Sequence, residues 1–297
     1  MNLLTISELS KAEIDALVER AIELKAMRAE GTPHKVLDGK TLGLIFEKAS
    51  TRTRVSFEAG MNQLGGGSVF LSQEASQIGR GEPVKDTARV MSRYVDAVVI
   101  RTFGHGIIEE FAEYADVPVI NGLTDMHHPC QVLADVMTMV EEKGSYDGLK
   151  VAWIGDGNNM ANSWIEVATI LGFDLSIACP EGYCPEEVIT AEAGGNVKVC
   201  TTVEAAVEGA DVLNTDVWAS MGQEEEQKIR IEAFKGYQIN AEMLRLAKSD
   251  AMVMHCLPAH RGEEITDEVI EGKNSVVWNQ AENRLHIQKA ILERLIK

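Results

Sequence analysis

A run of hydroxyl and guanidinium side chains, Ser50-Thr51-Arg52-Thr53, has the composition of an anion-binding turn. It follows a short apolar run, residues 41–46, and precedes a helical pattern over residues 55–64. A helix start presents free backbone N–H groups and about half a positive charge, so it binds phosphate readily. The hydroxyls add donors, and Arg52 adds a planar fork for phosphate oxygens. An ordinary helix cap followed by surface arginines explains the same residues equally well.

Other chemically useful side chains follow later apolar runs, and ligands of open α/β sheets lie at the carboxyl ends of strands. They are Arg101, His128, Pro129, Cys130, Gln131, Asn159, Asp216 and Cys256. Each also has an ordinary structural explanation, such as a solvated arginine, a structural histidine, a turn-forming aspartate or a buried thiol. Taken singly, none of these residues decides the function.

Two further segments contain residues that could bind a ligand, but their patterns do not support a functional site. Gly155-Asp156-Gly157 resembles the start of a dinucleotide-binding loop, but Met160 stands where the third glycine is required. A nucleotide-dependent oxidoreductase is therefore disfavoured, and a titration with NAD(H) tests it. The acidic run of residues 224–226 is typical of a solvated surface.

The elements that must position these residues form an alternating pattern. Ser10 and Glu13 form a capping-box pattern before a helical repeat of apolar residues. Short, continuous apolar runs then alternate with helical patterns, as in parallel sheets covered on both faces. The predicted strands are residues 41–46, 95–100, 117–120, 151–154, 175–178, 212–213 and 251–254. We expect an α/β protein with two tandem domains, each a parallel sheet flanked by helices, and a cleft between them.

The predicted domains have the usual size for a chain of 297 residues. The first covers residues 1–143 and ends with a helix over 129–143. A turn-rich hinge at 144–148 precedes the second domain, residues 148–280. The final helix, within 281–297, is expected to pack back onto the first domain.

Composition excludes several classes of protein. A formal net charge of −18 is incompatible with a broad basic surface for nucleic acid. No apolar stretch approaches the roughly 20 residues that span a bilayer. Five cysteines without a CxxC pair predict neither a disulfide framework nor a zinc knuckle. The first residues lack the basic and apolar regions of a signal peptide, so we expect a soluble, cytoplasmic protein.

Together, five segments resemble the ornithine carbamoyltransferases, in order and at matching spacing, over essentially the whole chain. They are Ser-Thr-Arg-Thr-Arg (50–54), Arg-Thr-Phe (101–103), His-Pro-Cys-Gln (128–131), Asp-Val-Trp-Ala-Ser-Met-Gly (216–222) and His-Cys-Leu-Pro (255–258). The resemblance implies transfer of a carbamoyl group from carbamoyl phosphate to the side-chain amine of L-ornithine. It implies homotrimers or multiples of trimers, and the chemistry requires neither a metal nor an organic cofactor.

The resemblance also assigns site residues. The implied carbamoyl-phosphate contacts are Ser50, Thr51, Arg52, Thr53, Gln77, Arg101, His128, Pro129, Cys130, Gln131, Cys256, Leu257 and Arg284, with Gln77 delivered by a neighbouring subunit. The implied catalytic residues among them are Arg52, Arg101, His128 and Cys256. The implied ornithine contacts are Asn159, Asp216, Ser220 and Met221.

Two alternatives to this function stay open. A carbamoyltransferase for putrescine differs only in lacking recognition of an α-carboxylate and α-ammonium, which Asp216 and Ser220 would provide. A non-catalytic regulatory subunit would be expected to lack Arg52, His128 or Cys256, and all three are present. Aspartate as acceptor is disfavoured because Ser220-Met221-Gly222 offers no cation for a second carboxylate.

Overall fold

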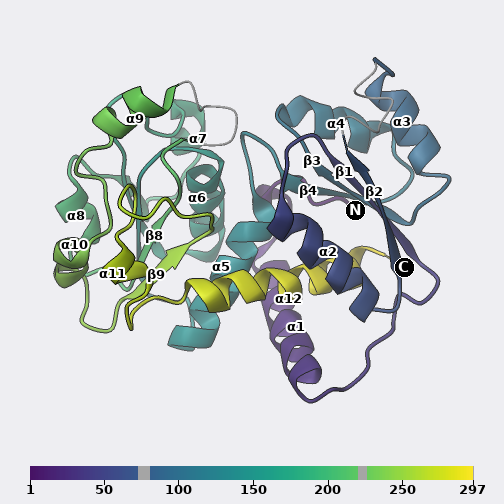
Figure 1. Ribbon diagram of the computed structural model, residues 1–297, viewed down its shortest axis with the longest axis horizontal. Coiled ribbons are helices and arrows are strands. Elements are labelled where there is room, and N and C mark those ends of the chain that lie inside the picture. The colour runs from purple at the N-terminus through teal and green to yellow at the C-terminus, as the bar shows by residue number, and fades with distance from the viewer. Residues whose placement is uncertain (73–80, 220–225, 297) are drawn as a thin grey trace. The chain divides into compact units, whose positions relative to one another are not determined.

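Parallel strands and helices alternate along the chain in a computed structural model, which describes residues 1–72, 81–219 and 226–296 (Figure 1). Contacts divide the chain into two units. The first unit is Met1–Met137 with the segment from Asn283 onward, and the second is Thr138–Glu282. The predicted fold class, two α/β units each with a parallel sheet, is confirmed.

The first unit has a four-stranded sheet in the order β2-β1-β3-β4, with all neighbours parallel. Its strands are β1 (Thr41–Phe46), β2 (Gly67–Ser72), β3 (Ala97–Arg101) and β4 (Val119–Leu123). Its helices are η1 (Ile6–Glu8), α1 (Lys11–Ala29), α2 (Thr51–Gln63), α3 (Val84–Met91) and α4 (His105–Tyr114). Buried side chains such as Val98, Ile108 and Phe111 join the sheet to α3 and α4.

The second unit has a five-stranded sheet in the order β7-β6-β5-β8-β9, again parallel throughout. Its strands are β5 (Lys150–Ile154), β6 (Asp174–Ala178), β7 (Val197–Val199), β8 (Val212–Thr215) and β9 (Met252–His255). Its helices are α6 (Asn159–Leu171), α7 (Glu187–Ala191), α8 (Val203–Val207), α9 (Gln227–Ala233), α10 (Ala241–Leu246) and α11 (Asp267–Ile270).

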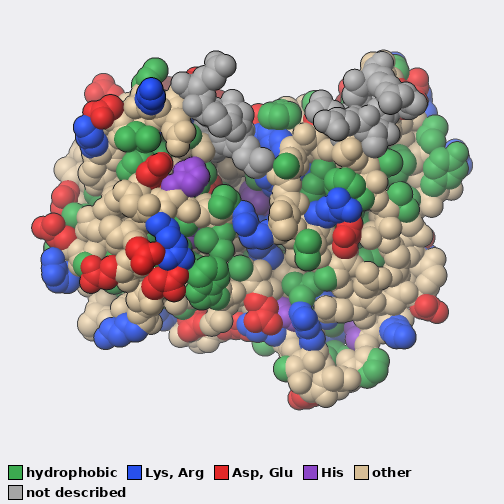
Figure 2. Space-filling view, viewed as in Figure 1, with side chains coloured by type: hydrophobic (Ala, Val, Ile, Leu, Met, Phe, Trp, Pro, Cys, Tyr) green, Lys and Arg blue, Asp and Glu red, His purple; other side chains and the backbone are tan. Residues whose placement is uncertain are grey.

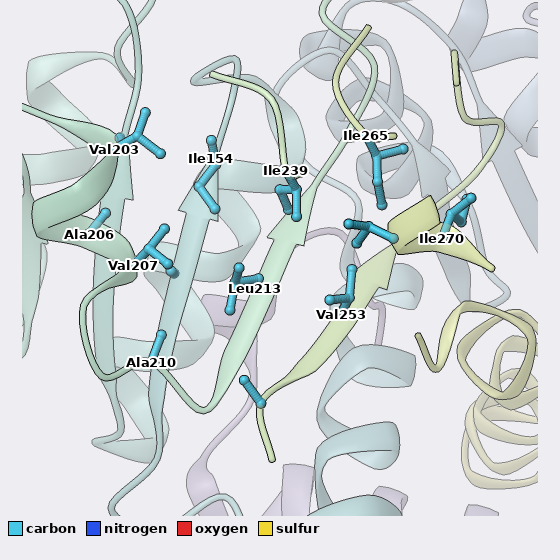
Figure 3. Close-up of a cluster of buried hydrophobic side chains, with 14 of the residues drawn as sticks. Ile154, Val203, Ala206, Val207, Ala210, Leu213, Ile239, Val253, Ile265 and Ile270 are labelled. Atoms are coloured by element: carbon cyan, nitrogen blue, oxygen red, sulfur yellow. The ribbon is translucent and has the colours of Figure 1, made fainter. Parts of the chain in front are cut away.

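The core of the second unit lies over β5, β8 and β9. Figure 3 shows Ile154, Leu213 and Val253 on these neighbouring strands, with Val207 of α8 and Ile270 of α11 packed against them. All five side chains are at most 1% exposed. This core fixes the three strands, and therefore the residues that follow their carboxyl ends.

Two long helices contain the residues at which the units divide. They are α5 (Pro129–Lys143), divided between Met137 and Thr138, and α12 (Val277–Leu295), divided between Glu282 and Asn283. The division in α5 lies a few residues before the predicted boundary at 143–148. Within the first unit, α12 packs against α1, where Arg20 Nη2 lies 3.0 Å from Glu293 Oε1.

Ser10 and Glu13 form the predicted capping box at the start of α1. Glu13 N donates to Ser10 Oγ at 3.4 Å, and Ser10 N donates to Glu13 Oε2 at 2.9 Å. We expect Ser10→Ala to lower the free energy of unfolding by about 1 kcal/mol, because the hydrogen bonds of the Ser10 hydroxyl with Glu13 are then lost. Urea unfolding measures the change. The exposed Glu19→Ala should shift stability by less than about 0.5 kcal/mol, and an equal effect of both variants would contradict this account.

Charge on the surface is mixed. Figure 2 shows acidic side chains beside basic ones on the face drawn there, and Arg261 of the second unit contacts both Asp267 and Glu271. Such exposed pairs contribute little to stability. Among the described residues, no helix is both long and apolar enough to span a bilayer.

Candidate functional site

The start of α2 forms a turn with the geometry of an anion site. Ser50 is the N-cap, and its Oγ accepts from Thr53 N at 3.2 Å. The helix therefore begins at Thr51, four residues before the predicted start, because the cap and not the first apolar residue nucleates it. The side chains of Thr51 and Arg52 are exposed. The first-turn N–H groups have no acceptor within the helix, so this end attracts negative charge.

Arg284 of α12 joins three helices of the first unit. Its Nη2 donates to Thr53 Oγ1 on α2 at 2.8 Å, and its Nη1 donates to Gln131 Oε1 on α5. Gln131 Nε2 in turn donates to Asp135 Oδ1 at 2.8 Å. Arg284 is 3% exposed, so its charge lies in a poorly hydrated environment. The structure thus brings together the three predicted residues Thr53, Gln131 and Arg284.

His128 lies beside this guanidinium. Arg284 Nη1 is 3.5 Å from His128 Nε2, and since a guanidinium only donates, Nε2 presents its lone pair. Burial, followed by the charges of Arg284 and Arg101, holds the pKa of His128 well below its ordinary value. The imidazole is therefore neutral, with its proton on Nδ1. We call Thr53, Arg101, His128, Gln131 and Arg284 the guanidinium cluster.

The neutral state of His128 predicts a pH dependence of stability. As pH falls below about 6.5, the unfolded chain takes up a proton on this residue that the folded protein does not. Stability should therefore be full above about pH 6.5 and fall at lower pH, by up to about 1.4 kcal/mol per pH unit. Urea unfolding between about pH 5 and 8 measures the slope. The free energy of unfolding of the His128→Gln variant should depend less on pH than that of wild type. Identical slopes for the two proteins would contradict a buried neutral imidazole at His128.

Arg101 ends β3 and is buried. The register between β3 and β4 shifts between Ile100 and Arg101, where the chain of β4 contains Gly122. A Cβ at Gly122 would lie 3.0 Å from Val99 Cγ1 and 3.1 Å from Ile100 O. Glycine therefore permits the close approach of β4 to β3 at the point where the register of the two strands shifts.

Pro129 and Cys130 begin α5, where proline is well suited because its missing N–H needs no partner. Cys130 Sγ donates to Asn121 O of β4 at 3.5 Å. Burial raises the pKa of the Cys130 thiol to about 12, so it stays protonated. Its side chain packs against the sheet, and a contact between Cys130 and carbamoyl phosphate stays a prediction.

In the second unit, three polar side chains meet at the carboxyl ends of the adjacent strands β5, β8 and β9. Asn158 Nδ2 donates to Asp216 Oδ2 at 3.2 Å, and Cys256 Sγ donates to Asp216 Oδ1 at 2.9 Å. Asn158 also caps α6 by accepting from Met160 N at 2.9 Å. We call Asn158, Asp216 and Cys256 the strand-end cluster. Its carboxylate is suited to a cationic group.

The predicted Asn159 is buried at the first position of α6, directly after Asn158. Three other predicted residues, Gln77, Ser220 and Met221, lie outside the described residues. Leu257 follows Cys256 with a φ of 58°, before a cis bond to Pro258. Its N–H donates to His255 Nδ1 at 2.8 Å.

Ligand atoms of Asp216, His255 and Cys256 lie within 4.8 Å of one another, a spacing that suits a metal ion. However, His255 Nδ1 accepts from Leu257 N, and its Nε2 lies 2.9 Å from Glu264 Oε1. With both ring nitrogens engaged, two ligands are left, fewer than the three that catalytic zinc sites use. The donor set therefore favours hydrogen bonding over metal binding.

The sequence did not predict an ion pair that lies next to the strand-end cluster. Arg230 Nη1 lies 3.0 Å from Asp156 Oδ2 and donates to Trp218 O at 2.9 Å. Burial raises the pKa of Asp156 to about 6, and the Arg230 charge opposes part of that rise. Gly157 follows, where a Cβ would lie 2.2 Å from Pro185 N. Gly157 therefore allows the backbone after Asp156 to pack closely against Cys184 and Pro185.

Comparisons with known proteins agree with this division of residues. The carbamoyl-P binding domain of the aspartate/ornithine carbamoyltransferases matches residues 1–141, and their Asp/Orn binding domain matches residues 147–295. An ornithine carbamoyltransferase of Geobacter metallireducens is 59% identical over 298 residues, covering 99% of this chain and 98% of the relative. The solved structure of ornithine carbamoyltransferase from Pyrococcus furiosus superimposes with a TM-score of 0.95 at 51% identity, covering 99% and 96%. That of Burkholderia thailandensis gives 0.93 at 47% identity, covering 99% and 98%. The chain belongs to the ornithine carbamoyltransferase family.

Proposed function

We propose that the chain transfers the carbamoyl group of carbamoyl phosphate to the side-chain amine of L-ornithine, giving L-citrulline and phosphate. The observation that carries the proposal is that one unit contains a cationic site suited to an anion and the other contains a carboxylate suited to a cation. The guanidinium cluster and the start of α2 offer cations and free N–H groups to an anion in the first unit. The strand-end cluster offers a carboxylate to an ammonium group in the second.

The reaction makes three demands on the residues. The leaving phosphate needs its charge stabilised, which Arg52 and the first turn of α2 provide. The carbonyl needs polarisation, which Arg101 and the Nδ1–H of neutral His128 provide. The third demand is loss of a proton from the attacking amine.

An amine of this kind titrates near pH 10 in water. Desolvation and nearby arginines lower that value and favour the nucleophilic free base. In the proposed mechanism Asp216 pairs with the α-ammonium of ornithine, and Cys256 orients the attacking amine. The departing phosphate is one candidate acceptor of its proton. Cys256 is the other, provided that its own proton has first passed to Asp216, to which the thiol donates.

Initial rates with several amines test the proposal. We expect citrulline from ornithine and carbamoyl phosphate, with much slower reaction of putrescine, N-acetylornithine and aspartate. Faster carbamoylation of putrescine would instead make the chain a putrescine carbamoyltransferase, the nearest alternative. Absence of product from all four amines would contradict a catalytic role.

We further propose that the protein acts in the cytoplasm as a homotrimer or a multiple of trimers, in arginine biosynthesis or, in reverse, arginine breakdown. The support is the full-length similarity to ornithine carbamoyltransferases. A trimer would let Gln77 reach the carbamoyl phosphate of a neighbouring subunit. Light scattering on the purified protein should give the mass of three chains or a multiple, and a monomer would contradict it.

A further inference from the structure

The turn after β9 has a backbone conformation that its own residue does not favour. Leu257 has a φ of 58°, and among the described residues it alone has a side chain at a positive φ. A leucine rarely adopts this conformation, because its Cβ approaches its own carbonyl oxygen. Such residues persist where surrounding contacts hold them, and they concentrate at functional sites. Cys256, which contacts Asp216, is the preceding residue.

A buried chain of hydrogen bonds reaches this turn. Leu257 N donates to His255 Nδ1 at 2.8 Å, so the ring proton lies on Nε2. His255 Nε2 then donates to Glu264 Oε1 at 2.9 Å. The side chains of His255 and Glu264 are both fully buried. Glu264 Oε1 also accepts from His260 N at 2.6 Å, which fixes the carboxylate itself.

The tautomer of His255 decides whether its ring can accept the hydrogen bond from Leu257 N. With the proton on Nδ1, the ring would face Leu257 N donor to donor, and the turn would lose the bond that holds its backbone. A carboxylate at Nε2 prevents this exchange, because it requires a proton there. Ring nitrogen, thiol and carboxylate of His255, Cys256 and Asp216 lie within 4.8 Å of one another. A change in the tautomer or position of the His255 ring should therefore alter the geometry of Cys256 and Asp216 in the strand-end cluster.

We propose that Glu264 is a positioning residue for the carbamoyl transfer: through His255 it holds Leu257 and Cys256 in the geometry that the acceptor amine requires. The proposal rests on the proposed function. The Glu264 side chain is fully buried, and its Oε1 accepts from His255 Nε2 and His260 N, so we place it outside the contacts to the substrates. Its removal should therefore affect the ornithine step far more than carbamoyl-phosphate binding, because Cys256 and Leu257 are the two predicted carbamoyl-phosphate contacts that belong to this turn, and the others lie elsewhere in the chain.

The test compares Glu264→Leu with Glu264→Gln. Leucine removes the acceptor, whereas glutamine keeps an oxygen for His255 Nε2. We expect E264L to lower kcat/KM for ornithine at least tenfold, with Kd for carbamoyl phosphate, measured by calorimetry, within twofold of wild type. E264Q should stay within about threefold of wild type in both quantities. An E264L enzyme with unchanged ornithine kinetics would overturn the proposal.

A double-mutant cycle separates positioning from loss of stability. Because Glu264 acts through His255, adding E264L to His255→Ala should lower kcat/KM by no more than twofold further. Independent, multiplying losses would overturn the proposal. Val207→Ala in the core of the same unit is the control, since it should lower stability without changing ornithine kinetics.

A third variant keeps the test decisive if E264L does not fold. His255→Asn retains an acceptor for Leu257 N and should keep at least fivefold more activity than His255→Ala. Equal activity of these two variants would contradict the role of the Leu257 bond. Wild-type protein that makes no citrulline would instead refute the proposed function, so the two failures are distinguishable.

Discussion

Replacing Arg52 with alanine should lower kcat/KM for carbamoyl phosphate about a hundredfold or more, which corresponds to about 3 kcal/mol of transition-state binding. Arg52 lies in the first turn of α2 with its side chain exposed, so its removal should leave the fold intact. The loss arises because a guanidinium fork no longer neutralises the charge that grows on the leaving phosphate. Initial rates at varied carbamoyl phosphate and saturating ornithine measure it.

Arg54 offers a matched control two residues away on the same helix. Its Nε donates to Glu58 Oε1 at 3.0 Å, and its guanidinium stacks on Phe70 at 3.6 Å from the ring centroid. Because the Arg54 guanidinium is already engaged by Glu58 and Phe70, the Arg54→Ala variant should keep kcat/KM within threefold of wild type. The kcat/KM of Arg52→Lys should lie between those of Arg52→Ala and Arg54→Ala, since lysine keeps the charge and loses the planar fork. An R52A enzyme within threefold of wild type would remove Arg52 from the site.

The strands that sequence predicted are those buried on both faces. β1 appears with its predicted bounds, and β5 and β6 differ by one residue at their starts. The two strands that were missed, β2 and β7, form edges of their sheets. The other two edge strands, β4 and β9, are buried and were predicted. β2 and β7 are partly exposed, so their residues need not form a continuous apolar run, and Val69 and Val199 are each 48% exposed. The continuous apolar runs in the sequence therefore identified the buried strands, whereas partly exposed strands left no such pattern.

The candidate site was predictable where motif residues follow strands or begin helices. Thr53, Gln131 and Arg284 were all predicted, although Arg284 is separated from Thr53 by 231 positions in the chain. No local pattern brings such residues together, and the family resemblance supplied that link. Asp135, Asp156 and Glu264 were missed. Each is a single acidic residue whose effect depends on a buried partner that spacing in the sequence does not indicate.

A structural reason also explains the early start of α2. Apolar periodicity begins at Val55 and predicts a helix from that residue. The first turn instead carries polar side chains, because its N–H groups are those that a ligand or the Ser50 cap must satisfy. The segment with the greatest chemical interest is therefore the one in which the helical pattern of apolar residues is absent.

Replacing Asp216 with asparagine should raise KM for ornithine about a hundredfold, with Kd for carbamoyl phosphate within twofold of wild type. Asparagine has nearly the same shape and can still accept from Val217 N and Cys256 Sγ, which lie 2.8 and 2.9 Å from Asp216 Oδ1. What it loses is the charge proposed to pair with the α-ammonium of ornithine, together with the oxygen that accepts from Asn158 Nδ2. A hydrogen bond between charged groups is worth about 1.5–3 kcal/mol, and the upper value corresponds to this change in KM.

Asp211 supplies the control for Asp216, because it is also a buried aspartate adjoining β8, at the opposite end of the strand. Its carboxylate pairs with Lys248 Nζ at 2.7 Å and accepts from Lys150 N at 3.0 Å. Asp211→Asn should therefore lower stability while leaving KM for ornithine within twofold. If both variants raised KM equally, the effect would come from weakening the sheet. If D216N stayed within threefold of wild type, the carboxylate would not be the partner of the ammonium group, and the acceptor would have to be held by other residues.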